Sequence, residues 1–235
     1  MSFRIGVVTF PGSLDDRDAA RAVEMAGGTA VPLFHASDDL KEVQAVVLPG
    51  GFSYGDYLRC GAIARFAPIM NSIVTAADHG FPVLGICNGF QIACEAGLLP
   101  GALLRNASLR FVSAPVHLRV DSIATRFTSA YHIGQVISIP VAHGDGRYTA
   151  DANTLARLEG EGRVVFRYVS AQGDATASAN PNGSLRNIAG IVSAEGNVLG
   201  MMPHPERALH ATLGSTDGVP LFASILESML AEVKA

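Results

Sequence analysis

The stretch from Gly85 to Gly89 constrains the fold of this chain more than any other. It reads Gly-Ile-Cys-Asn-Gly, follows the apolar run Phe81–Ile86 and precedes Phe90–Cys94, which reads as a helix. A nucleophile between two glycines, where a strand passes into a helix, is the pattern of a nucleophile elbow. The glycines permit the sharp turn, and the helix N-terminus favours the thiolate form of Cys87. The pattern predicts covalent chemistry on a carbonyl carbon, although a small buried cysteine in a tight turn would also fit it.

Segments with strand character alternate with segments of helical spacing on both sides of this elbow. The expected strands of the first part are residues 3–10, 29–34, 45–48 and 82–86, and the expected helices are 15–26 and 62–79. Such alternation predicts a parallel sheet with helices on both faces. The later part contains expected strands at 109–120, 133–142 and 163–169, a closing hairpin at 188–192 and 197–202, and a helix at 219–233. The chain is therefore expected to be one α/β domain over residues 1–235. Its central sheet should be mostly parallel, with added antiparallel strands in the C-terminal half.

The composition excludes several classes of protein. Charged residues make up 16% of the chain, against roughly 25% in typical soluble domains. A partner that covers part of the surface would explain this deficit, and so would a compact enzyme. The net charge is −4 and lysine and arginine do not cluster, so neither nucleic acid nor a membrane surface is an expected partner. No apolar run reaches the about 20 residues of a membrane span.

The cysteines point to a reducing compartment. The chain has three of them, Cys60, Cys87 and Cys94, an odd number that does not form a disulfide framework. A cytoplasmic location is expected. Their spacing lacks a paired cysteine or histidine, which predicts no metal site, and the absence of a GxxxxGK[ST] loop predicts no ATP bound through a P-loop.

A catalytic cysteine needs a base, and the segment Met202–Glu206 offers one. It reads Met-Pro-His-Pro-Glu, and a residue before proline favours extended conformations. In an extended chain, residues i and i+2 project from the same side, so His204 and Glu206 are expected to lie side by side. Glu206 would hold one ring nitrogen and leave the other facing Cys87. A solvated surface turn would explain the pair on its own, but together with the elbow it predicts a catalytic triad.

Three further residues are expected near the nucleophile. The N–H of Asn88 follows Cys87 at a helix start, and Gly51 ends a neighbouring strand in Pro49-Gly50-Gly51-Phe52, so both could donate to an oxyanion. Gln91 lies four residues after Cys87 and shares its helix face, so it could bind a polar substrate. A plain turn and a glutamine at the edge of the core are the alternatives.

These motifs together resemble the class I (triad) glutamine amidotransferase family. The family places its nucleophile in Gly-x-Cys-x-Gly and carries His-x-Glu far downstream, as Cys87 and His204–Glu206 stand here. The runs at 10–13, 50–56, 143–148 and 200–207 resemble those of members that serve purine biosynthesis. The chain departs from the family at Leu14-Asp15, where Asn-Cys is frequent, and this difference is expected to leave the triad untouched.

The resemblance implies a flavodoxin-like three-layer fold and a glutaminase that works with a synthase. Cys87 would attack L-glutamine, His204 and Glu206 would complete the triad, and Gly51, Asn88 and Gln91 would serve the oxyanion and the substrate. The ammonia would pass to a large synthase subunit, with an optional small accessory subunit, for the ATP-dependent conversion of formylglycinamide ribonucleotide to formylglycinamidine ribonucleotide. The resemblance implies ATP and Mg²⁺ on that partner and no cofactor on this chain. The loop His143–Tyr148 would border the site or the partner, unless it is an ordinary turn.

Two other functions remain open at this point. One is a cysteine hydrolase or peptidase of a related flavodoxin-like fold, which would act on peptides or esters without a partner. The other is a non-catalytic regulatory subunit that keeps the fold and hydrolyses no glutamine. An α/β-hydrolase is disfavoured because its acid precedes its histidine in the chain, whereas His204 here precedes Glu206.

Overall fold

The computed structural model describes residues 3–234, and in that range a nine-stranded sheet forms the centre of the molecule. Its strands follow the order β2-β1-β3-β4-β11-β10-β9-β6-β7. They are β1 (Arg4–Thr9), β2 (Thr29–Phe34), β3 (Ala45–Leu48), β4 (Val83–Ile86), β6 (Val112–Val120), β7 (Val136–His143), β9 (Val164–Val169), β10 (Ile188–Val192) and β11 (Val198–Met201). A separate two-stranded sheet pairs β5 (Ala102–Leu104) with β8 (Arg147–Thr149).

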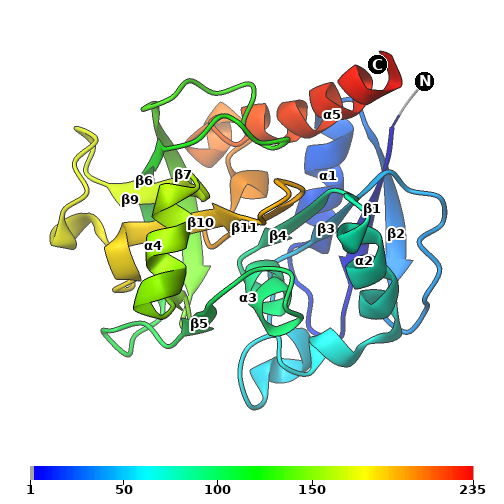
Figure 1. Ribbon diagram of the computed structural model, residues 1–235, viewed down its shortest axis with the longest axis horizontal. Helices are drawn as coiled ribbons and strands as arrows, with labels where there is room; N and C mark the ends of the chain where they lie inside the picture. Colours follow the sequence, from blue (N-terminus) through cyan, green and yellow to red (C-terminus); the bar gives the residue numbers. More distant parts are fainter. Residues whose placement is uncertain (1–2, 235) are drawn as a thin grey trace.

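The half of the sheet from β2 to β11 is parallel, as expected from the alternation of strands and helices. Strands β3 and β4 are buried along their whole length, because helices cover both faces. These helices are α1 (Asp16–Met25), α2 (Pro68–Asp78), α3 (Asn88–Glu95) and α5 (Val219–Lys234). Helices α1 and α5 lie on one side of the sheet, and α2 and α3 on the other (Figure 1). Right-handed crossovers place α1 and α2 on opposite faces, because the step from β1 to β2 and the step from β3 to β4 go in opposite directions along the strand order. The expected three-layer α/β fold is confirmed.

The other half of the sheet is antiparallel, which confirms the expected additions. The predicted hairpin forms between β10 and β11, and β6, β7 and β9 pair beyond it. Helix α4 (Ala152–Gly160) lies over these strands (Figure 1) and was not predicted. Asp151 caps the start of this helix: its side chain accepts hydrogen bonds from the N–H groups of Asn153 and Thr154. A search for apolar residues at helical spacing does not detect such a cap. Among the described residues, no helix has both the length and the apolar character needed to cross a bilayer.

The parallel strands determine where the functional residues meet. Strands β1, β3, β4 and β11 run in the same direction, so the segments that follow them reach one edge of the sheet. In open α/β sheets, ligands bind at this carboxyl edge. The segments that converge there are 10–15, 49–52, 87–88 and 202–206.

Candidate active site

Cys87 occupies a sharp turn between β4 and α3. Its backbone has φ 50° and ψ −104°, a conformation that side chains rarely adopt. The turn brings α3 so close to β3 that a Cβ on Gly89 would overlap the carbonyl oxygen of Leu48, while a Cβ on Gly85 would lie 2.7 Å from the carbonyl oxygen of Gly89. The N–H of Cys87 donates to the carbonyl of Met201 at 2.7 Å, which ties the turn to the end of β11. The two glycines are therefore steric requirements of the elbow.

The same edge carries the histidine and its carboxylate. His204 Nδ1 lies 2.6 Å from Glu206 Oε1, and both side chains are buried. The backbone N–H of His204 donates to the carbonyl of Pro140 in β7 at 2.8 Å, which fixes the start of the turn.

The local backbone differs from the expected extended segment. His204 itself has φ −104° and ψ 85°, but Pro205–Arg207 form a turn of 3₁₀ helix. A proline at the first helical position has a φ suited to such a turn and lacks only an N–H that would stay unpaired there. The side chains of His204 and Glu206 therefore meet across a tight turn, and not along an extended strand.

The remaining ring nitrogen of His204 is available to the nucleophile. Nε2 is buried and completes no hydrogen bond of good geometry with a described atom. Burial lowers the pKa of His204, but the charge of Glu206 and the neighbouring thiolate of Cys87 outweigh it, and the net pKa lies well above its usual value. A protonated histidine stabilises a neighbouring thiolate, so His204 and Cys87 can act as a thiolate–imidazolium pair.

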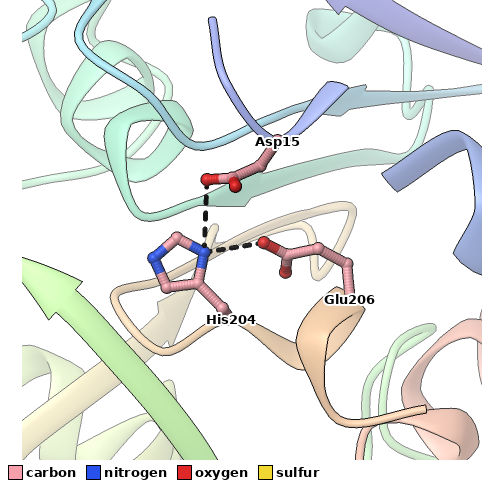
Figure 2. A group of neighbouring side chains, drawn as sticks. All are labelled: Asp15, His204 and Glu206. Carbon is pink, nitrogen blue, oxygen red and sulfur yellow. Dashed lines mark hydrogen bonds and ion pairs between the residues drawn. The ribbon is translucent and has the colours of Figure 1, made fainter. Parts of the chain in front are cut away.

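A second carboxylate approaches the same histidine. Asp15 Oδ2 lies 3.5 Å from His204 Nδ1, the same nitrogen that Glu206 engages (Figure 2). The other oxygen of Asp15 pairs with the guanidinium of Arg207. The expectation that the departure at Leu14-Asp15 leaves the triad untouched is therefore wrong. The loop after β1 folds over the end of β3, where the N–H groups of Leu14 and Asp15 both donate to the carbonyl of Gly50.

The side chains of Asp15, His204 and Glu206 form a compact group. Their ligand atoms lie within 4.8 Å of one another, a spacing that a metal ion could use. Glu206 already engages Nδ1 of His204, however, and Asp15 engages Arg207. We interpret the group as a hydrogen-bond and ion-pair network.

Two backbone N–H groups flank Cys87. Asn88 begins α3, so its N–H has no partner within the helix. Gly51 pairs with Ser13 in an isolated β-bridge, whose hydrogen bonds use the carbonyl of Gly50 and the N–H of Phe52. The N–H of Gly51 itself has no acceptor among the described residues. Gly51 has φ 146°, and a Cβ there would lie 2.6 Å from the carbonyl oxygen of Gly12. Only glycine fits this position.

A cavity of about 210 Å³ opens beside Cys87. It is smaller than the about 300–1,000 Å³ typical of sites for drug-sized ligands. It is lined by Gly51, Phe52, Asp56, Cys60, Cys87, Gln91, Arg105, Phe111, Ala142, His143, Gly144 and Asp145. A larger groove of about 960 Å³ beside α2 contains none of the predicted site residues.

The loop after β7 forms one wall of the cavity. Gln91 Nε2 donates to the carbonyl of Asp145 at 2.7 Å, and Gln91 Oε1 accepts from Asn88 Nδ2 at 2.8 Å. Gln91 thus braces the wall with one of its two amide hydrogens. Cys87 Sγ lies 3.8 Å from the carbonyl oxygen of Ala142 at the base of the same wall. Of the interpretations of the 143–148 loop, the structure favours the one in which it borders the site.

His143 is expected from the sequence only as the first residue of the loop that borders the site, with no role of its own. It is buried in the wall, where burial and the nearby charge of His204 lower its pKa to about 4. Nε2 faces Asn182 Nδ2, which can only donate, so Nε2 accepts and Nδ1 donates to Asn106 Oδ1 at 3.2 Å. His143 is therefore neutral at pH 7, and both of its ring nitrogens are occupied by protein groups.

Comparisons with known proteins show the family to which this chain belongs. The family model of the CobB/CobQ-like glutamine amidotransferase domain matches residues 2–218. A relative from Rhodococcus jostii, named phosphoribosylformylglycinamidine synthase subunit PurQ, is 61% identical over 231 residues, which cover 98% of this chain and 99% of the relative. A relative of the same name from Mycobacterium tuberculosis is 59% identical, with coverage of 98% and 99%. A solved structure of PurLQS from Thermotoga maritima contains a chain that superposes with a TM-score of 0.87 at 43% identity, covering 97% of this chain and 100% of that one. The chain belongs to the CobB/CobQ-like glutamine amidotransferase family.

Proposed function

We propose that this chain is the glutaminase subunit of a phosphoribosylformylglycinamidine synthase. It is an enzyme of the glutamine amidotransferase class, as the family match and the full-length relatives indicate. The observation that carries the proposal is the meeting of Cys87 with His204 and Glu206 at the carboxyl edge of the sheet, beside a cavity for a small ligand. A small cavity and a thiol nucleophile suit the side-chain amide of an amino acid better than a polypeptide substrate.

The reaction follows from the positions of these groups. The Cys87 thiolate attacks the side-chain amide carbon of glutamine, and the carbonyl oxygen becomes an oxyanion between the N–H groups of Gly51 and Asn88. One such donor is typically worth about 3 kcal/mol. His204 gives the Nε2 proton to the departing nitrogen, which leaves as ammonia and yields a glutamyl thioester. His204 then takes a proton from water, whose oxygen attacks the thioester carbon, and glutamate is released while Glu206 holds Nδ1.

The cavity also presents charges suited to a free amino acid. Asp56 and Asp145 line it together with Arg105. The two carboxylates suit an α-ammonium group, and the guanidinium suits an α-carboxylate. A peptide carries neither group at an internal residue, so this lining supports free glutamine as the substrate and counts against a peptidase.

The rim of the cavity supports a partner. Phe52 and Phe111 line the cavity and are 44% and 55% exposed, and the adjoining Tyr57 and Leu58 are 74% and 89% exposed. Apolar side chains gathered at the mouth of a site are typical of a protein interface. The relatives named above are subunits of a synthase, and the occupant that we propose is the large synthase subunit, with an optional small accessory subunit.

This partner would complete the reaction. It would accept ammonia directly, because ammonium ion is not a nucleophile, and it would carry the ATP and Mg²⁺ for amidine formation. A cytoplasmic location fits this role in purine biosynthesis.

The decisive experiment separates the two half-reactions in the assembled complex. Cys87→Ala should abolish glutamine-dependent synthesis and leave ammonia-dependent synthesis intact. Cys94→Ala, which removes a partly buried thiol that does not line the cavity, is the matched control and should retain both activities. Equal loss of both activities in Cys87→Ala would contradict the division of labour, and full glutamine-dependent activity would exclude Cys87 as the nucleophile.

A further inference from the structure

Asp15 is held beside His204 by contacts from two segments, the turn that carries His204 and Arg207 and the end of β3 at Gly50. Its carboxylate is only 4% exposed, and one oxygen pairs with Arg207 while the other lies 3.5 Å from His204 Nδ1. Its backbone N–H donates to the carbonyl of Gly50 at 3.2 Å. A buried carboxylate is costly unless it is paired, so this placement has to be compensated by specific partners. Arg207 and the protonated ring of His204 are those partners.

The packing leaves the carboxylate little room to move. A Cβ on Gly50 would overlap Asp15 Oδ2 and would lie 2.8 Å from His204 Cε1. The glycine therefore creates the space in which the carboxylate and the ring meet. Asp15 cannot swing away without losing Arg207, whose side chain is 37% exposed and follows the histidine by three residues in the chain.

The charged and titratable groups around the ring come from four parts of the fold. Glu206 and Arg207 lie on its own turn, Asp15 follows β1, Cys87 follows β4, and His143 ends β7. His143 is neutral at pH 7 and adds no charge. The protonation of the His204 ring therefore depends on Cys87 at one ring nitrogen and on two carboxylates near the other. Arg207 offsets part of the charge of Asp15. This matters because a histidine that binds its proton too tightly would be a poor acid toward the leaving nitrogen.

We propose that Asp15 is a positioning residue of the amidotransferase reaction, which holds the protonated ring of His204 against Cys87 with a charge that Arg207 attenuates. This inference rests on the proposed function. It concerns a position at which the chain departs from the pattern of its family. Glu206 takes the Nδ1 hydrogen bond, and Asp15 adds a second negative charge at van der Waals distance from the same atom.

The test measures the rate at which iodoacetamide alkylates Cys87 as a function of pH, with mass spectrometry assigning the label. Asp15→Asn keeps the shape of the side chain and removes its charge. The thiolate–imidazolium pair loses support, so the pH of half-maximal alkylation should rise by about one unit, the lower end of the effect of one neighbouring charge. Arg207→Gln should move it the opposite way, because the charge of Asp15 is then no longer attenuated. Glu24→Gln removes an exposed charge from the far end of α1 and should leave the midpoint unchanged.

A purely structural role would reduce the amount of reactive protein in both variants without moving the midpoints in opposite directions. An unchanged midpoint in Asp15→Asn, or shifts of the same sign in the two variants, would overturn the proposal. If Asp15→Asn does not fold, Arg207→Gln decides alone: a lower midpoint supports the proposal and an unchanged or higher one overturns it. Labelling of wild-type Cys87 by a glutamine-analogue electrophile tests the proposed function separately, since its failure would not depend on Asp15.

Discussion

Gly50 lies beneath the proposed catalytic histidine, and its replacement by alanine should disable the site without altering any group that reacts. A Cβ at this position would lie 2.8 Å from His204 Cε1, whereas ordinary contacts begin at 3.4 Å, and it would overlap Asp15 Oδ2. The ring must therefore move by about 0.6 Å, and the Asp15 carboxylate by more. Gly50 does not have a positive φ, so alanine brings no backbone strain and the effect is steric.

The size of the effect follows from this displacement. A misplacement of about 1 Å in a catalytic constellation can cost about 100-fold in rate, so a shift of the ring should lower kcat/KM for glutamine by about 10- to 100-fold. Overpacking of a buried site typically costs about 1–3 kcal/mol, which should leave the protein folded. The loss should appear mainly in kcat, because Gly50 does not line the cavity.

The assay is glutamine hydrolysis by the complex, with urea unfolding of the variant measured in parallel. Gly160→Ala is the matched control, because a Cβ there meets nothing within 4 Å and the residue ends α4, away from the site. It should be fully active. Wild-type kcat/KM in Gly50→Ala would refute the steric argument and, with it, the close packing of Asp15 on His204.

Three further outcomes follow from the same geometry. Gly89→Ala should destabilise the protein by about 3 kcal/mol in urea unfolding, because its Cβ would overlap a backbone carbonyl of β3 that cannot yield; a smaller loss than that of Gly50→Ala would contradict the elbow packing. His143 binds its proton near pH 4 when folded and near 6.5 when unfolded, so the unfolded state binds more protons between these values and stability is lost as the pH falls through them. The loss amounts to about 3 kcal/mol, and His143→Gln should escape it when unfolding at pH 7 and pH 4.5 is compared with wild type. Burial raises the pKa of the Cys60 and Cys94 thiols, so iodoacetamide at pH 8 should label Cys87 first, and mass spectrometry showing Cys60 or Cys94 ahead of it would argue against its role as nucleophile.

The parts of the fold that could be predicted are those in which local sequence determines local structure. The strands before the elbow and the closing hairpin appear where apolar runs end in turn residues, and the elbow itself needs Gly85 and Gly89 for steric reasons that are visible in the motif. Helix α4 was missed because its pattern is weakly apolar, and β5 and β8 because each is three residues long. Such short strands form only through contacts with distant partners.

The candidate site shows the same division. The pairing of His204 with Glu206 was predicted from an extended segment, and the contact forms although the backbone turns into a 3₁₀ helix after His204. Asp15 was missed because its distance from His204 along the chain hides the contact. A usable signal was present, since Asp15 follows the end of β1 and the ends of parallel strands share one edge of the sheet. The strand order alone does not predict that this loop folds back over Gly50.

The antiparallel half of the sheet contributes contacts to this site, although none of its strands carries a member of the proposed triad. Strand β7 accepts the N–H of His204 at Pro140, places the carbonyl of Ala142 3.8 Å from Cys87 Sγ, and leads into the loop whose Asp145 carbonyl accepts from Gln91. One strand thus supports the histidine, the nucleophile and the cavity wall together. Because β7 is the last strand in the sheet order, its contact with His204 means that the sheet curls back toward its parallel half. Changes that loosen the pairing of β6 with β7 should therefore lower glutaminase activity before they unfold the parallel half.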